Sequence, residues 1–424
     1  MNIYCSGIGG IGLSAYAALM RSQGHTVSGS DRAQSEILDD LRSQGIPVTL
    51  MQDGSAIPES CGLFVYTEAL AIDHPERSEA QKRGIRSISY FTALGEISKS
   101  HNVIAVSGTH GKSSTTGMLA NILIDAGKDP TVIVGTKLPD LDGRNWRAGA
   151  SDLFVLEACE YRRSFHALSP DTIVITTVDG DHYDYYASLD DYHRAFTEFV
   201  QQLPVNGSVV VHGEDDDALR IVESASRVVI DADRLPLPEL SVPGLHMRQN
   251  AQLALAAAEH LGVERAIALQ SLRAYRGAWR RMELIGMFQD IPVIDDYGHH
   301  PREIAATLQA TEEKYPKHRI VCVFQPHTHD RTLKLYEEFT QAFSQADIVI
   351  IPGIYDARPD RDAAAVDLHA FVSDIAKGSQ TECRDGVSLE VTEKLLREEI
   401  LRSGDVLLVM GAGDVTGLAR KIVT

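Results

Sequence analysis

The chain has 424 residues and a formal net charge of −19 at pH 7. An acidic balance of this size argues against general nucleic-acid binding, because contacts to phosphates need clustered Lys and Arg. The length predicts roughly two to three domains, and the absence of any apolar run of about 18 residues predicts that no segment spans a membrane.

The cysteines and the N-terminus give two further expectations. The five cysteines show no CxxC spacing, which predicts reduced thiols in a cytoplasmic protein. Residues 3–5 already begin a predicted strand, so we expect no signal peptide.

Residues 2–31 are predicted to form a strand, a glycine turn, a helix over residues 13–23, and a second strand. The glycines of the turn are Gly7, Gly9, Gly10 and Gly12. Glycine lets the backbone approach a pyrophosphate, and Asp31 is placed to accept a hydrogen bond from a ribose hydroxyl. NAD, FAD and UDP-sugars all carry a pyrophosphate, so the ligand stays open, as does a tight turn without a ligand. Thr67 ends a later strand on the side of the sheet where ligands bind.

Residues 103–126 carry the pattern of a phosphate-binding loop. An apolar run at 103–106 predicts a buried strand, and apolar residues at helical spacing end at Gly127. Between them lie Gly108, Thr109, His110, Gly111, Lys112, Ser113 and Ser114. Main-chain N–H groups at a helix N-terminus favour an anion, Lys112 is suited to the β- and γ-phosphates of ATP, and the Ser113 hydroxyl is suited to Mg²⁺. Position 106 is Val where the standard pattern has Gly, so an ordinary glycine turn is the alternative.

The next two predicted strands, 153–156 and 172–177, are followed by polar residues. Glu157 comes directly after the first and is predicted to bind Mg²⁺, because this ion prefers oxygen ligands. His182 follows the second strand. It is predicted either to bind the metal or to hydrogen-bond a metal ligand without binding the metal itself, since imidazole is an unusual ligand for a hard cation. Glu160 is either a surface carboxylate or a functional one.

A long helix is predicted through residues 250–261, opening near His246. His246 and Asn250 are four residues apart, which places them on one face near the start of the helix. Both side chains are able to hydrogen-bond the edge of a purine.

The last third alternates predicted strands and helices, which indicates another α/β domain. Its strands, 291–294, 319–324, 347–351 and 406–410, each end in polar residues, and this series predicts a binding rim. Among the rim residues are Asp296, Tyr297, His299, His327 and Arg331. The histidines lack the HExxH or Cys/His pair spacing of a zinc site.

Taken together, the motifs resemble those of the Mur ligases along nearly the whole chain. The motifs that carry the resemblance are GIGGIGLS at 7–14, GSD at 29–31, GTHGKSS at 108–114, GDHYDYY at 180–186, RRME at 280–283, DDYGHHP at 295–301, FQPHTHDRT at 324–332 and MGAGD at 410–414. The resemblance implies an α/β fold of three domains. These are a Rossmann-like UDP-sugar-binding domain at 1–98, a P-loop ATPase-like ATP-binding domain at 99–284, and a Rossmann-like amino-acid-binding domain at 285–424.

The resemblance also implies a reaction with ATP and Mg²⁺. ATP would phosphorylate the lactyl carboxylate of UDP-N-acetylmuramate (UDP-MurNAc), and the amine of L-alanine would attack the acyl phosphate, as in peptidoglycan precursor synthesis. Lys112 and Ser113 would hold phosphates and metal, and Glu157 and His182 would bind a first and a second Mg²⁺. His246 and Asn250 would contact adenine, Arg281 would reach ATP, and Asp296 would lie near the ribose.

The other substrates are assigned in the same way. The turn from Gly7 to Gly12, with Asp31 and Thr67, would surround the UDP-sugar. The residues implied to hold the amino acid or act on it are Tyr297, His299, His327 and Arg331. The resemblance places no requirement on oligomeric state beyond a monomer or a homodimer.

Four positions depart from the family pattern, and they keep other functions open. They are Cys159, Thr177, Met247 and Thr328. One alternative is a Mur-type ligase with another acceptor: serine, glycine or a recycled murein peptide. Another is an inactive UDP-sugar sensor. An NAD-dependent oxidoreductase would explain the first glycine turn but would leave the Gly-Lys-Ser loop without a purpose.

Overall fold

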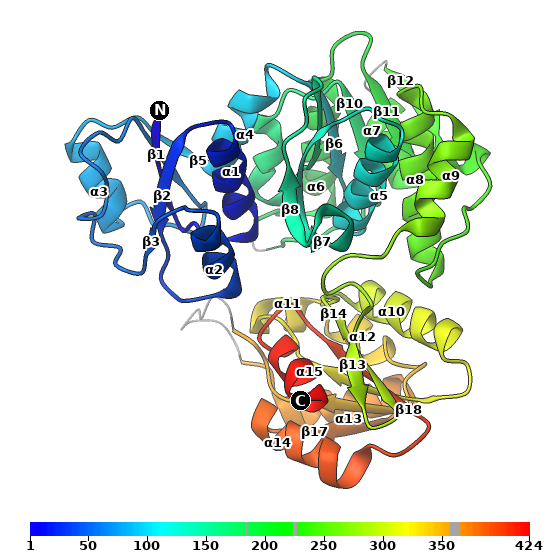
Figure 1. Ribbon diagram of the computed structural model, residues 1–424. Coiled ribbons are helices and arrows are strands. Elements are labelled where there is room, and N and C mark those ends of the chain that lie inside the picture. The colour runs from blue at the N-terminus through cyan, green and yellow to red at the C-terminus, as the bar shows by residue number, and fades with distance from the viewer. Residues whose placement is uncertain (184, 224–226, 357–364) are drawn as a thin grey trace. The chain divides into compact units, whose positions relative to one another are not determined.

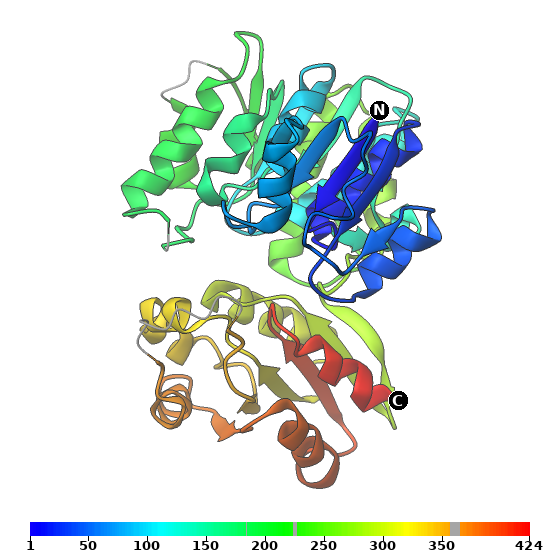
Figure 2. The same ribbon diagram turned by 90° about the vertical axis from the view of Figure 1, so that its left-hand side faces the viewer.

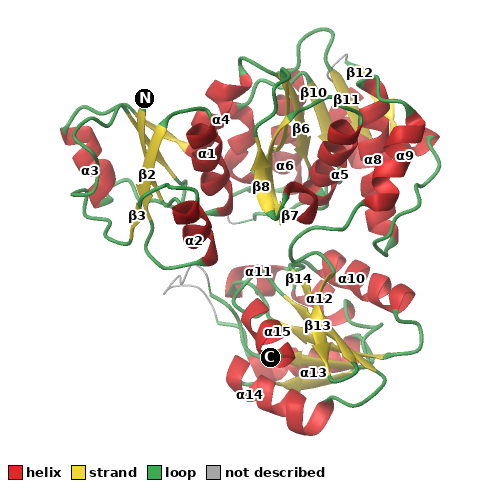
Figure 3. Cartoon of the chain, in the orientation of Figure 1, coloured by secondary structure: helices red, strands yellow, loops and turns green. Residues whose placement is uncertain are grey.

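The computed structural model describes residues 1–183, 185–223, 227–356 and 365–424. Asp184 of the GDHYDYY motif therefore lies outside the described residues. The described residues form three β-sheets with flanking helices (Figures 1 and 3), which confirms the predicted α/β fold class. It divides into two compact units, one of residues 1–239 and 250–275 and one of residues 240–249 and 276–424. The predicted domain boundaries at 98/99 and 284/285 stay a prediction.

The first sheet has the strand order β3-β2-β1-β4-β5 among the described residues, and all its pairs are parallel. Its strands are β1 (Asn2–Ser6), β2 (Thr26–Ser30), β3 (Val48–Thr49), β4 (Leu63–Tyr66) and β5 (Ser87–Ser89). Its helices are α1 (Ile11–Ser22), α2 (Glu36–Ser43), α3 (Pro75–Lys82) and α4 (Tyr90–Ser98). The parallel order brings the glycine turn after β1 and the end of β4 to the same edge, where such sheets bind ligands.

The second sheet has the order β12-β11-β10-β6-β9-β7-β8, and only β7 and β8 pair antiparallel in the part that the structure describes. Its strands are β6 (Asn102–Ser107), β7 (Thr131–Leu138), β8 (Arg144–Arg147), β9 (Leu153–Glu157), β10 (Thr172–Ile175), β11 (Ser208–Val211) and β12 (Val228–Asp231). Its helices are α5 (Lys112–Asp125), α6 (Leu189–Gln201), α7 (Asp216–Glu223), α8 (Leu245–His260) and α9 (Arg265–Ala274), with short turns η1 (Pro139–Leu141), η2 (Tyr161–Ala167) and η3 (Ala232–Arg234).

The two sheets of the first unit share one hydrophobic cluster. It runs from Ile3 and Tyr16 in the first sheet and its helix to Val103 and Phe154 in the second. Helix α1 lies against the β7–β8 hairpin, so the glycine turn at its start is fixed next to the second sheet. Burial of this apolar surface is the main force that joins the two sheets.

The third sheet has the order β13-β14-β18-β15-β16-β17, with β13 antiparallel to β14. Its strands are β13 (Glu283–Phe288), β14 (Ile291–Asp296), β15 (Arg319–Phe324), β16 (Ile348–Ile351), β17 (Glu382–Asp385) and β18 (Asp405–Met410). Its helices are α10 (Pro301–Lys314), α11 (His329–Lys334), α12 (Tyr336–Gln341), α13 (Leu368–Gly378), α14 (Leu389–Leu395) and α15 (Thr416–Val423), with the π-turn η4 (Leu396–Ile400).

Two apolar clusters cover the two faces of this third sheet. Alternate strand residues such as Val323 and Val409 pack under α15, and their neighbours Phe324 and Met410 pack under α10, α12 and α13. Figure 2 shows the ribbon of this sheet with its helices. This is a sheet with helices on both sides, as the sequence predicts for the last third. Across the described residues, none of the helices has the length and hydropathy that a membrane span requires.

Candidate functional site

The loop between β6 and α5 has a backbone that only glycine fits at two positions. Gly108 and Gly111 both have positive φ angles, +136° and +81°. A Cβ on Gly108 would lie 2.0 Å from Thr176 Oγ1, and one on Gly111 would lie 2.3 Å from Asn250 Oδ1. The loop is therefore pressed between the end of β10 and α8, and Gly111 directly precedes the first turn of α5. The main-chain N–H groups at the end of the loop therefore lie at the N-terminus of α5, which is the arrangement that favours an anion.

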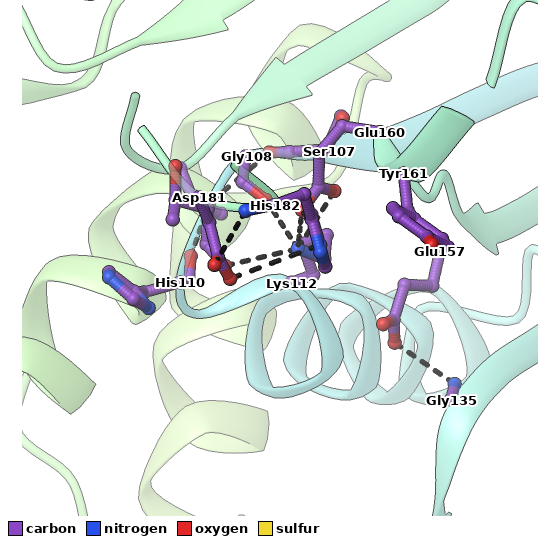
Figure 4. A network of polar contacts seen from close by, with 12 residues as sticks. Ser107, Gly108, His110, Lys112, Gly135, Glu157, Glu160, Tyr161, Asp181 and His182 are labelled. Carbon is purple, nitrogen blue, oxygen red and sulfur yellow. Dashed lines mark hydrogen bonds and ion pairs between the residues drawn. The ribbon is translucent and has the colours of Figure 1, made fainter. Parts of the chain in front are cut away.

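The Lys112 side chain folds back over this loop (Figure 4). Its Nζ donates to the carbonyls of Gly108 and Thr109, the second at 3.1 Å. The same Nζ lies 3.0 and 2.9 Å from the two carboxylate oxygens of Glu160. Glu160 is only 1% exposed, so the interpretation of this residue as a surface carboxylate is wrong.

The charges of Lys112 and Glu160 support each other. Burial favours the neutral forms of both groups, but the Lys112 ammonium and His182 outweigh it and hold the pKa of Glu160 below its usual value. In the same way the charge of Glu160 outweighs burial and raises the pKa of Lys112. Both groups are therefore ionised at neutral pH, and Lys112 is a positive charge in the loop.

Ser113 and Glu157 form the second polar contact of the loop. The Ser113 hydroxyl donates to Glu157 Oε2 at 2.7 Å, and the main-chain N–H of Gly135 donates to the same oxygen at 2.9 Å. A Cβ on Gly135 would fall 2.8 Å from the carboxylate, so glycine on β7 is what lets the strand approach Glu157. The predicted metal ligands Ser113 and Glu157 are thus brought together, and both offer oxygen.

His182 lies beside this centre in a left-handed backbone conformation, with φ +55°. Its Nε2 is 3.4 Å from Glu160 Oε1 and 3.9 Å from Asp181 Oδ2, and its ring lies 4.6 Å from that of Tyr161. These contacts favour the predicted role of a hydrogen-bonding neighbour. In the described parts of the chain, no group of three or more His, Cys, Asp or Glu side chains is arranged to hold a metal ion.

The glycine turn of the first sheet is closely packed. A Cβ on Gly7 would lie 2.4 Å from Thr67 Cγ2, one on Gly9 would lie 2.8 Å from Asp31 Oδ2, and one on Gly12 would meet the Tyr90 ring at 2.8 Å. Asp31 also accepts a hydrogen bond from the Gly9 N–H at 2.8 Å. The structure therefore brings Thr67 and Asp31 to the turn, and part of the hydrogen-bonding capacity of Asp31 is already used to shape it.

His246 and Arg281 belong to the second compact unit, whereas Asn250 belongs to the first. Burial, assisted by the positive charge of Arg281, lowers the pKa of His246 to about 4. The imidazole is therefore neutral at pH 7, the form that presents one donor and one acceptor. Arg281 lies 5.3 Å above the ring of Tyr297.

Asp296 shapes the turn after β14. It accepts main-chain hydrogen bonds from Met282 at 2.8 Å and Gly298 at 2.7 Å, and it is 4% exposed. Burial raises its pKa to about 6, although Arg281 and the two hydrogen bonds act in the opposite direction. The predicted ribose contact is thus a residue whose two oxygens already hold the backbone.

The other rim residues form a row of rings. His299 lies 5.5 Å from Tyr297 and 5.9 Å from His327, and His327 stacks on Tyr355 at 5.8 Å. Tyr355 also accepts a main-chain hydrogen bond from Thr328 at 2.9 Å. The structure brings the predicted residues Tyr297, His299 and His327 together and adds Tyr355. Arg331 lies on α11, whose first turn Thr328 caps.

Three family models cover most of the chain. They are described as the Mur ligase family catalytic domain, matched at residues 2–102, the Mur ligase middle domain, at 106–234, and the Mur ligase glutamate ligase domain, at 280–413. This chain is a Mur ligase.

Relatives of this Mur ligase match over nearly its whole length. It is 35% identical over 443 residues to the UDP-N-acetylmuramate--L-alanine ligase of Clostridium botulinum, with 98% of this chain and 95% of that relative covered. The enzyme of the same name from Clostridium acetobutylicum is 36% identical, with 97% and 95% covered. The crystal structure of UDP-N-acetylmuramate-alanine ligase MurC from Thermotoga maritima superposes with a TM-score of 0.84 at 28% identity and covers 100% of this chain and 98% of its own.

A murein peptide ligase shares the fold. The structure from Psychrobacter arcticus has a TM-score of 0.74 at 24% identity and covers 100% of this chain and 98% of its own.

The four departures of this Mur ligase from its family pattern have structural explanations at two positions. Thr177 braces the phosphate loop, because its hydroxyl accepts from the His110 N–H at 3.1 Å and its carbonyl accepts from Thr109 at 2.8 Å. Thr328 caps α11 through its hydroxyl. Burial raises the pKa of Cys159 to about 12, so this thiol is protonated, and Met247 is buried.

Proposed function

We propose that this Mur ligase joins L-alanine to the lactyl carboxylate of UDP-MurNAc at the expense of ATP, in the cytoplasmic synthesis of peptidoglycan precursors. The proposal is supported by relatives of that name, which align over 97–98% of the chain at 35–36% identity. The single structural observation that carries it is the charged Lys112 in a glycine loop, beside the Ser113–Glu157 pair.

The chemistry explains why these residue types are needed. A carboxylate is a poor acyl donor until one of its oxygens becomes part of a phosphate leaving group. Phosphoryl transfer to it brings two anions together, so catalysis is mainly positioning and charge stabilisation. Lys112 supplies the positive charge, and the N–H groups of Gly111 to Ser114 at the start of α5 supply the dipole. The amine of L-alanine then attacks the carbonyl carbon of the acyl phosphate, and inorganic phosphate leaves.

Magnesium fits the oxygen donors present beside the loop. Ser113 and Glu157 would hold it, because a hydroxyl and a carboxylate are the ligands that this ion prefers, and the two already lie 2.7 Å apart. Bound Mg²⁺ supplies charge neutralisation for the triphosphate. His182 is proposed as a neighbour of this group or as the ligand of a second ion.

The other substrates are assigned to the elements that the sequence singled out. We place the UDP-sugar at the glycine turn of residues 7–12 with Asp31 and Thr67. We place the adenosine of ATP near Asn250 and His246, with Arg281 and Asp296. The amino acid is assigned to Tyr297, His299, His327 and Arg331. We also propose that the chain forms three domains, at residues 1–98, 99–284 and 285–424. The expected assembly is a monomer or a homodimer.

The decisive experiment is phosphate release by the purified protein with UDP-MurNAc, ATP, Mg²⁺ and one amino acid at a time. Release that depends on L-alanine supports the proposal. Release only with serine, glycine or a murein tripeptide would identify a ligase with another acceptor. Release that never exceeds the level without an amino acid or peptide would leave the UDP-sugar sensor, and Lys112→Ala would then not alter the binding of UDP-MurNAc.

A further inference from the structure

Glu160 contacts the residue at the centre of the proposed chemistry, yet the proposed reaction assigns it no role. It follows β9 by three residues and is 1% exposed. Its main chain is fixed, because its carbonyl accepts a hydrogen bond from the Arg163 N–H at 2.9 Å and another from the Tyr186 hydroxyl. A buried carboxylate held this firmly costs free energy unless its charge is compensated.

Lys112 provides that compensation and uses all its donors to do so. An ammonium group has three N–H donors. In this structure they face three acceptors: the carbonyls of Gly108 and Thr109 and the carboxylate of Glu160. Lys112 can therefore reach a phosphate oxygen only by giving up one of these partners. Glu160 is the charged partner among them, so it is the one that competes with a phosphate for the same positive charge.

We propose that Glu160 is a positioning residue that competes with the terminal phosphate of ATP for the Lys112 ammonium. Before the triphosphate binds, Glu160 holds Lys112 over the Gly108 and Thr109 carbonyls, and it gives up the ammonium when the triphosphate binds. Glu160 keeps a partner after the exchange, because His182 Nε2 lies 3.4 Å from its Oε1. The inference rests on the proposed function only in taking ATP as the phosphate donor.

The proposed competition predicts the sign of the change in ATP affinity when the charge of Glu160 is removed, which a merely structural role does not. Removal of the negative charge in Glu160→Gln frees Lys112 for the phosphate and removes a repulsion on the triphosphate, so ATP binding becomes tighter. The turnover number falls, because ADP and phosphate are retained by the same freed ammonium. A lower KM for ATP together with a lower kcat is the expected split.

The experiment is isothermal titration of the full chain with a non-hydrolysable ATP analogue and Mg²⁺. We expect Glu160→Gln to bind the analogue about tenfold more tightly than the natural chain, which corresponds to about 1.4 kcal/mol. Glu160→Asp keeps the charge but withdraws it by one methylene, so a smaller gain is expected. The matched control is Glu198→Gln, which neutralises a carboxylate paired with Arg163 at 2.7 Å rather than with Lys112 and should bind as the natural chain does.

A double-mutant cycle separates the mechanism from general effects. In a Lys112→Met background, Glu160→Gln should give no gain in affinity, because the lysine that it frees is absent. Equal or weaker analogue binding by folded Glu160→Gln, or the same gain without Lys112, overturns the proposal. If Glu160→Gln does not fold, weaker binding by Glu160→Asp does so. Absence of analogue binding by the natural chain would instead contradict the proposed function.

Discussion

Asn145 donates a hydrogen bond from its side-chain amide to the main-chain carbonyl of Ile11, at 2.5 Å. Asn145 lies on β8, and Ile11 lies within the glycine turn of residues 7–12 at the first position of α1, so this contact ties the hairpin of the second sheet to the proposed UDP-sugar site. The same hairpin carries Gly135, whose N–H holds Glu157. The β7–β8 hairpin therefore contacts the first glycine turn directly and is linked to Ser113 of the phosphate loop through Glu157.

Asn145→Ala is expected to destabilise the protein and to weaken UDP-sugar binding. The side chain is 8% exposed, and its loss removes one donor to the Ile11 carbonyl, which keeps the Ser14 hydroxyl as a donor at 2.9 Å. The loss of one such hydrogen bond costs about 0.5–1.5 kcal/mol. Urea unfolding measures the stability and calorimetry with UDP-MurNAc measures the binding. The control is Arg144→Ala on the exposed neighbour, which should change stability by no more than about 0.5 kcal/mol. Equal stability of the two variants would contradict the role of Asn145.

Glu157→Gln is expected to raise the Mg²⁺ concentration needed for half-maximal activity by roughly tenfold or more, because a neutral amide is a poorer ligand for a hard cation. Ser113→Ala should act in the same direction but less strongly, since a hydroxyl contributes no formal charge. Both are measured by titration of Mg²⁺ in the phosphate-release assay, and Glu198→Gln serves as the control. An unchanged Mg²⁺ dependence in Glu157→Gln would show that this carboxylate does not hold the ion.

The parts of the fold that were predictable from sequence have local signals. An apolar run, a glycine loop and apolar residues at helical spacing predict the β6–α5 unit, and the structure places it at Asn102–Ser107 and Lys112–Asp125. The glycine turn before α1 and the strands β14, β15 and β18 were found in the same way. In each case the residues that form the element also carry the pattern that identifies it.

The elements that the sequence did not predict depend on distant partners. Strand β8 has the sequence RNWR and β17 has ECRD, and neither shows apolar alternation. β8 forms because it pairs with β7 and packs on α1, and β17 because it adds an edge to β16. Strand β7 is apolar, but Gly135 interrupts it, and that glycine is needed for the approach to Glu157.

The same reason explains which site residues were missed. The character of Glu160 is decided by Lys112, which lies 48 residues earlier in the chain. No local pattern reports that contact, so the sequence left the residue open between surface and site. Tyr355 is placed beside His327 by pairing between two loops of the third sheet. Spacing within the sequence identified the types of side chain at the site, while their pairing required the fold.

Asp296 and His246 are expected to give opposite pH dependences of stability. Folding raises the pKa of Asp296 from its ordinary value near 3.8 to about 6. Between these two pH values the folded protein therefore binds more protons than the unfolded protein. Stability from this group is present below about pH 4 and is lost as the pH rises to about 6. The folded state lowers the pKa of His246 from 6.5 to about 4, so its contribution has the other sign and is lost as the pH falls from 6.5 toward 4.

Single substitutions should therefore expose the remaining group. Asp296→Asn should abolish the decrease of about 3 kcal/mol in the free energy of unfolding that Asp296 causes between pH 4 and pH 6. The free energy of unfolding of this variant should then rise between about pH 4 and pH 6.5, where His246 titrates. In His246→Gln it should fall with pH instead. Urea unfolding at half-unit steps between pH 4 and pH 7 measures both slopes. The natural chain should lie between the two variants, because its two contributions oppose each other. Parallel slopes in the two variants would contradict the assignment of these groups.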